Sequence, residues 1–384
     1  MSGAHERSVR RRGGAPSGAD VASARGGLLK YVAPRDIPDS QDLLTGAALE
    51  DVLNAGREPD FSLIAVGDLM LGGRAKSVIA ARGSDYPFEA VLPLLRRAPI
   101  VLANLEGPFA RIAGRKQRNH SYRVNPALAA ALPEAGINLV TLANNHLLDC
   151  GRAGVRETLE ALERAEVAVV GAGIDEPAAH RAVIREAGRL RIGVLGYYWN
   201  RRCAATTTRP GSAMDPPAAL AADIGGLRPR VDRVVVTFHW GVPYERQPSP
   251  ADRAKARFAI DCGADVVIGH HPHVVQPVEI YAGRPIFYSV GNFAFGSGNS
   301  RAEGLLIGVR FDLHETSVEA YPLYVKNRDA RVNYQPKVLA GRGAERVLRH
   351  FVEMSGASGE LLEVQEVRVR LRLPRAAGEG RAHG

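Results

Sequence analysis

The sequence predicts an α/β protein whose central β-strands are covered by helices on both faces. Apolar runs of strand length recur between residues 61 and 288, and amphipathic helical patterns lie between several of them. This alternation is typical of a sheet whose two faces are both buried. Later segments instead alternate apolar and polar residues, as half-buried antiparallel strands do.

The strands are expected where apolar residues run continuously or alternate with polar ones. The continuous runs lie at 61–66, 100–103, 139–142, 167–170, 192–195, 234–238, 266–268 and 286–288. The alternating segments lie at 305–313, 317–324 and 364–373. The two patterns together predict a mostly parallel centre and an antiparallel flank.

Three helices are expected from periodicity and capping signals. Residues 154–164 carry apolar side chains on one helical face. Residues 250–262 follow Ser249, which is a suitable N-cap. A further helix is expected near 40–56, before the first strand.

The composition is that of an ordinary globular protein and excludes several other classes. Of the 384 residues, 45% are apolar and 24% are charged, which excludes a disordered or collagen-like chain. No apolar stretch reaches the length of a membrane-spanning helix. The formal charge is +9, but residues 1–30 and 361–384 hold most of the excess. Because solvated basic tails are commoner than nucleic-acid arms, no nucleic-acid partner is expected.

The cysteines and the N-terminal residues bear on the compartment. The three cysteines form no paired motif, so they predict neither a disulfide framework nor a thiolate metal site. Cysteines that do not form disulfides are typical of proteins in a reducing compartment. No apolar segment follows the basic N-terminal residues, so a secretion signal is not expected. These observations predict a cytoplasmic protein with no membrane span.

Polar side chains follow one expected strand after another, at the point where each strand ends. Functional groups of α/β proteins gather beyond the carboxyl ends of strands, so these side chains are expected to converge. They are Asp68, Asn104, Glu106, Asn144, Asn145, His146, His239, His270, His271, His273 and Asn292. Three histidines within four residues are the strongest single indication of a metal site.

This set of donors predicts a centre for one or two divalent metal ions. Carboxylate, amide oxygen and neutral imidazole suit Mn, Fe or Zn better than Ca or Mg, which prefer oxygen ligands alone. Such a centre activates water and stabilises the oxygens of a phosphoryl displacement. His146 is the candidate for a general acid. The lack of cysteine ligands disfavours a structural zinc site.

The order of the motifs resembles that of a known family. The motifs are GDLMLGG at 67–73, NLEGP at 104–108, YRVNP at 122–126, LANNHLLDCG at 142–151, FHWGVPYERQPS at 238–249, GADVVIGHHPHVVQPVE at 263–279 and IFYSVGNFAFG at 286–296. The chain is similar to the CapA-type poly-γ-glutamate capsule biosynthesis proteins, whose fold resembles the calcineurin-like metallophosphoesterases. The resemblance implies a four-layer α/β sandwich of mixed central sheets flanked by helices.

The resemblance also implies roles for individual residues and a division of the chain. The implied metal ligands are Asp68, Glu106 as the bridging acid, Asn145, His239, His271 and His273. The implied catalytic residues are His146 and Asn144, and the implied substrate-binding residues are Arg123 and Asn292. Residues 1–60 are expected to be a flexible basic extension with a helix, 61–325 the metallophosphoesterase-like domain, and 326–384 a C-terminal extension with a terminal strand.

One position departs from the phosphoesterase pattern. The usual Asp-x-His is Asp68-x-Met70 here, so one metal loses an imidazole ligand. Two interpretations remain open at this point: a weakened second metal site or a mononuclear centre.

Two functions are compatible with the sequence. The first is a metal-dependent hydrolase that cleaves a phosphoester or a γ-glutamyl amide in poly-γ-glutamate or capsule-type polymer metabolism. The alternative is a non-catalytic accessory subunit of a complex that makes or exports such a polymer. The expected partners are an acidic small-molecule or polymer substrate and a polymer synthase.

Overall fold

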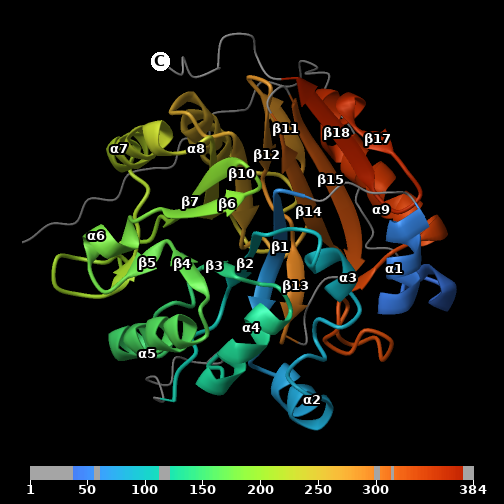
Figure 1. Ribbon diagram of the computed structural model, residues 1–384, viewed down its shortest axis with the longest axis horizontal. Helices are drawn as coiled ribbons and strands as arrows, with labels where there is room; N and C mark the ends of the chain where they lie inside the picture. The colour runs from blue at the N-terminus through green and yellow to red at the C-terminus, as the bar shows by residue number, and fades with distance from the viewer. Residues whose placement is uncertain (1–37, 56–60, 112–121, 298–302, 313–314, 375–384) are drawn as a thin grey trace, which may run out of the picture. The chain divides into compact units, whose positions relative to one another are not determined.

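Two large mixed β-sheets pack face to face, and helices cover the outer face of each (Figure 1). The structure is a computed structural model that describes residues 38–55, 61–111, 122–297, 303–312 and 315–374. Most of the predicted basic extension, residues 1–37 and 56–60, therefore lies outside the described residues.

The first sheet combines the first four strands of the chain with the antiparallel strands near its C-terminal end. Its order is β17 (Glu363–Val364), β18 (Val369–Pro374), β15 (Glu315–Tyr324), β14 (Glu303–Phe311), β1 (Leu63–Met70), β2 (Val101–Leu105), β3 (Leu139–Thr141) and β4 (Ala168–Val170). Strands β1 to β4 are parallel, whereas β14, β15, β17 and β18 pair antiparallel. Two further strands pair with interior strands of this sheet: β13 (Asn292–Phe295) pairs with β1, and β16 (Lys337–Val338) pairs with β15.

The second sheet has a parallel centre between two antiparallel edges. Its order is β11 (Val278–Tyr281), β12 (Arg284–Phe287), β10 (Val266–His270), β9 (Arg233–His239), β7 (Leu190–Tyr198) and β6 (Val183–Ala187). The four central strands run parallel, and β11 and β6 run against their neighbours. A small separate ladder joins β5 (Ala172–Gly173) and β8 (Gly211–Ser212).

The side chains of β1 show how the layers form. Leu63 and Ala65 point into the core between the two sheets, whereas Ile64 and Val66 point into the core beneath the helices. This alternation follows from the two-residue period of a strand that is buried on both faces. The helices that cover this outer face are α1 (Gly46–Ala55), α2 (Ala75–Arg82), α3 (Leu92–Leu95), α4 (Ala131–Glu134) and α5 (Gly151–Arg164).

The outer face of the second sheet is covered in the same way. Helices α7 (Pro217–Leu227) and α8 (Pro250–Asp261) pack Leu220, Ile224 and Ile260 against residues of β7, β9 and β10. The shorter α6 (Glu176–Ala179) and the amphipathic α9 (Gly341–Met354) complete the α-helices of the described residues. The predicted four-layer α/β sandwich is therefore confirmed.

The predicted strands and helices form, with two differences. The segment 305–313, expected as a half-buried strand, forms β14, whose residues are almost all buried. All eight continuous apolar runs form strands, and Ser249 caps α8 by accepting a hydrogen bond from Asp252 N at 3.1 Å. The segment 364–373 forms two strands, β17 and β18, and not one. A turn closed by the bond from Gln365 N to Arg368 O separates them. Among the described residues, no helix is both long and apolar enough to cross a membrane.

Residues on either side of the predicted central domain contribute to its core. Leu49 and Leu53 of α1 are buried in the core beneath the helices, and Leu43 pairs with Leu339. Strand β18 extends the first sheet. The division of the chain at residues 60 and 325 stays a prediction.

Candidate metal centre

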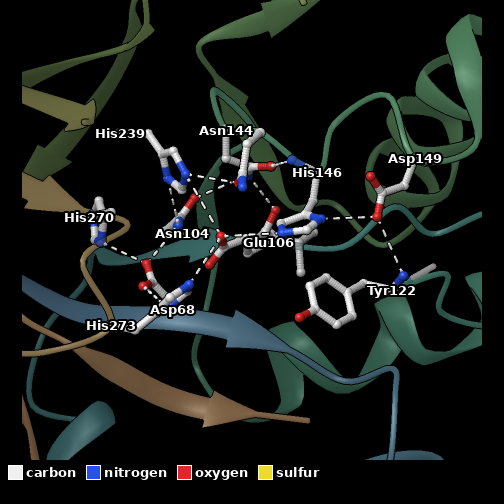
Figure 2. Close-up of polar contacts among 12 residues, drawn as sticks. Asp68, Asn104, Glu106, Tyr122, Asn144, His146, Asp149, His239, His270 and His273 are labelled. Carbon is white, nitrogen blue, oxygen red and sulfur yellow. Dashed lines mark hydrogen bonds and ion pairs between the residues drawn. The ribbon is translucent and has the colours of Figure 1, made fainter. Parts of the chain in front are cut away.

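The carboxyl ends of β1, β2, β3, β9 and β10 bring the predicted polar residues together (Figure 2). In the first sheet Asp68 lies opposite Asn104, and in the second His270 lies opposite His239. Glycine is required next to this site, because a Cβ on Gly67 would lie 2.1 Å from a backbone oxygen. That oxygen belongs to Gly291, and the close approach lets Asp68 N donate to it at 3.0 Å where β13 begins to pair with β1.

Glu106 lies at the centre of the histidines. Its carboxylate is fully buried, and neither oxygen has a hydrogen-bond partner among the described residues. Glu106 Oε1 lies 3.7 Å from His239 Nε2 and 3.9 Å from His273 Nε2. One ligand atom each from Glu106, His271 and His273 falls within 4.8 Å of the others. Asn145 Oδ1 lies 3.0 Å from His239 Nε2, which adds an amide oxygen to the group.

These residues fit a divalent cation. A buried carboxylate without a hydrogen bond is costly unless a positive charge offsets the cost. His271 Nδ1 is also buried without a hydrogen-bond partner in the described chain, as are both ring nitrogens of His270. The group therefore contains nitrogen and oxygen atoms that are shielded from water and that protein groups leave unsatisfied, which is what a metal ion would satisfy.

The electrostatics of the group differ between two imidazoles whose pKa is lowered and a third whose pKa is raised. Burial lowers the pKa of His239 well below its usual value, and burial together with the His273 charge lowers the pKa of His271 to about 4. Burial opposes a charge on His273 too, but Glu106 and Asp68 raise its pKa to about 9. Burial and the Asp68 charge raise the pKa of Glu106 well above its usual value.

Asp68 has a different environment, because a protein nitrogen lies close to each of its oxygens, although its buried Oδ2 has no hydrogen-bond partner among the described residues. Its Oδ1 accepts a hydrogen bond from Asn104 Nδ2 at 2.7 Å, and its Oδ2 lies 3.0 Å from His273 Nδ1. Asn292 Oδ1 lies 2.9 Å from that same His273 nitrogen. Burial alone would raise the pKa of Asp68, but the neighbouring imidazoles of His270 and His273 lower it well below its usual value.

His146 lies at the edge of the group and remains partly accessible, with 16% of its side chain exposed. Its Nδ1 lies 3.0 Å from Asp149 Oδ2, and its Nε2 faces Glu106 Oε1 at 3.8 Å. Asn144 accepts a hydrogen bond from the His146 backbone at 3.1 Å. The imidazole is thus held at one nitrogen while the other points toward the centre (Figure 2).

Two residues at this edge were not predicted as site residues. The Tyr122 ring packs on the His146 ring with 4.3 Å between centroids, and Tyr122 N donates to Asp149 Oδ2 at 3.4 Å. The three-residue spacing between His146 and Asp149 was the available signal for their contact. The Tyr122 contact joins segments distant in sequence, so no local pattern indicates it.

The remaining predicted residues lie around the centre or apart from it. Asn144 is buried and donates to Asn104 Oδ1 and Leu105 O, so it braces the loop that carries His146. Met70, in place of the usual histidine, uses its sulfur to accept a hydrogen bond from Gly72 N. Arg123 donates to Arg111 O at 2.8 Å and lines a separate cavity. The catalytic, ligand and substrate-binding roles of the predicted residues stay predictions.

Comparisons with known proteins agree with the order of the motifs. A family model described as "Bacterial capsule synthesis protein PGA_cap" matches residues 62–297. The chain is 34% identical over 248 residues to the capsule biosynthesis protein CapA of Bacillus anthracis, covering 62% of this chain and 60% of that protein. It is 33% identical over 241 residues to the PGA biosynthesis protein CapA of Bacillus subtilis (strain 168), covering 62% and 63%. The matched region thus spans about six-tenths of the length of these relatives.

A search of solved structures finds a weaker likeness. The chain resembles the NAD nucleotidase of Haemophilus influenzae with a TM-score of 0.41 and 17% identity. The likeness covers 60% of this chain and 42% of the nucleotidase.

Proposed function

This chain belongs to the PGA_cap family of bacterial capsule synthesis proteins, and from that premise we propose that it is a metal-dependent hydrolase. Its proposed substrate is a phosphoester or a γ-glutamyl amide in the metabolism of a capsule-type acidic polymer. The observation that carries the proposal is the buried, unsatisfied Glu106 carboxylate surrounded by imidazoles, with His146 held beside it.

The residues that would hold the metal are those around Glu106. They are Glu106, Asn145, His239, His271 and His273. Their mixed nitrogen and oxygen donors suit Mn, Fe or Zn. A divalent cation bound there would polarise the bond to be cleaved and lower the pKa of water.

His146 supports a hydrolytic role, because a site that only binds needs no residue placed to move a proton. Asp149 accepts from Nδ1 and so fixes the orientation of the ring. Nε2 is then free to donate a proton to the leaving group as the bond breaks. Tyr122 packs on the ring and limits its rotation.

The contacts of Asp68 favour one metal ion over two. Its two oxygens face Asn104 Nδ2 and His273 Nδ1, so the carboxylate orients the His273 ring, whose other nitrogen faces Glu106. Carboxylates behind metal-binding histidines commonly have this role. We therefore propose that Asp68 and Asn292 position His273, and that Asp68 is not itself a metal ligand.

Replacing Asp68 by Asn tests this assignment. We expect Asp68→Asn to keep about one metal ion per chain and to weaken metal affinity about 10- to 100-fold, because His273 loses its orienting carboxylate. Elemental analysis and competition with a chelator would measure the two quantities. Two ions in the wild-type chain, with one lost in Asp68→Asn, would contradict it.

The proposed activity is tested by assaying the purified protein on a panel of phosphoesters and γ-glutamyl peptides after loading with Mn, Fe or Zn. We expect hydrolysis of one class, and its loss on chelation. Failure on both classes with every metal would contradict the proposal.

A further inference from the structure

A second cavity, apart from the metal centre, is rich in cations. It has a volume of about 500 Å³ and lies beside helix α2. Its charged lining residues are Lys76, Arg111 and Arg123, and none of the described residues that line it is acidic. Its apolar wall includes Ile79 and Leu128.

The acidic group that contacts these three residues in the part of the chain that the structure describes is Glu157, whose Oε1 accepts from the backbone N of Arg111 at 2.8 Å and not from its guanidinium. None of them lies in an ion pair there, although other arginines of the protein commonly do. Arg123 donates to the Arg111 carbonyl at 2.8 Å, which holds its guanidinium at the cavity. Burial and the charge of Arg123 both lower the pKa of Lys76, in agreement with a second positive charge close to this ammonium group.

The lining indicates the chemistry of the ligand. Three cations around one cavity suit a ligand with more than one negative group, because a single anion would leave repulsion between the others. The apolar wall suits methylene groups between those anions. An oligomer that carries a carboxylate on each unit, with short aliphatic segments between them, has both properties.

The cavity lies next to the loop that borders the metal centre. Arg123 directly follows Tyr122, whose ring packs on His146. Lys76 is the second residue of α2. This helix follows the end of β1, the strand that carries Asp68 (Figure 1). A chain held in the cavity would therefore lie near the centre without using its ligands.

We propose that this cavity is a binding site for a stretch of polycarboxylate chain, separate from the metal centre. The choice of ligand rests on the proposed function, whereas the site rests on Lys76, Arg111 and Arg123 alone. The site positions an acidic polymer through its carboxylates, and the metal centre is not needed for binding.

Binding of a fluorescently labelled oligo-γ-glutamate of defined length tests the proposal. We expect Lys76→Glu to weaken its affinity about five- to tenfold, because the change removes one attraction and adds a repulsion. Lys76 is exposed on α2, so the fold should tolerate the change. The matched control is Arg342→Glu, which changes the net charge equally at an exposed position of α9 and should leave the affinity within about twofold.

Two further measurements distinguish binding in this cavity from binding at the metal centre, and carboxylate ligands from other anions. The difference in oligo-γ-glutamate affinity between Lys76→Glu and Arg342→Glu should persist in chelator-treated protein. It should also persist if the protein hydrolyses no substrate, so failure of the proposed function would not remove this difference. Equal affinities of the two variants would overturn the site. Tighter binding of inorganic polyphosphate of equal charge than of oligo-γ-glutamate would overturn its assignment to carboxylates.

Discussion

Glu106→Gln is expected to remove the metal and, with it, the hydrolytic activity. The substitution keeps the shape of the side chain but replaces a buried carboxylate by a neutral amide, which is a poor metal ligand. A bound metal supplies several kcal/mol of transition-state stabilisation, so kcat/KM should fall at least about a thousandfold. The fold should survive, because removing a buried charge that has no hydrogen bond costs little stability.

The measurement is elemental analysis after gel filtration, together with kcat/KM. Glu134→Gln is the matched control, since Glu134 is exposed in α4 and is not one of the residues of the metal centre. It should keep the metal and the activity. One equivalent of metal bound to Glu106→Gln would contradict the assignment of Glu106 as a metal ligand.

His146→Ala is expected to lower kcat about 10²- to 10⁴-fold while the metal content stays unchanged. The reason is that His146 Nε2 is placed to donate a proton, whereas its Nδ1 is held by Asp149. Asp149→Asn should give a smaller loss in kcat with KM unchanged, and Asp149→Glu should recover part of it. His350→Ala, on helix α9, is a control for the loss of a histidine elsewhere.

Metal content distinguishes the outcomes for His146. Loss of metal in His146→Ala would make this residue a ligand and not an acid. An unchanged kcat on a substrate that the wild type hydrolyses would also contradict the assignment.

The apolar runs of the sequence were sufficient to predict strands covered on both faces, and the resemblance of the motifs implied the four layers. Strands β1 and β9 are continuous apolar runs because both their faces are buried, and that pattern is visible without a structure. It was not sufficient for the contacts of the flanking segments. The pairing of Leu43 with Leu339 joins residues far apart in the chain, and nothing local in the sequence indicates it.

The same limit applies to the site. Asp68 and Asn104 end neighbouring parallel strands of one sheet, so they could be predicted as neighbours. His239 ends a strand of the other sheet, so its approach to Glu106 depends on how the two sheets pack and not on one sheet edge. Their division into metal ligands and supporting residues could not. Asp68 and Glu106 are both buried carboxylates, but only the side-chain directions show that Asp68 faces His273 Nδ1 and that Glu106 has no hydrogen-bond partner among the described residues.

Titrating the metal-free protein with Mn, Fe or Zn while following hydrolysis tests the central claim most directly. We expect activity to rise in proportion to the added metal and to reach its maximum at about one equivalent per chain, with no rise for Glu106→Gln. Protein that binds no metal, or whose activity is indifferent to chelation, would contradict the account and favour an accessory role in polymer synthesis or export.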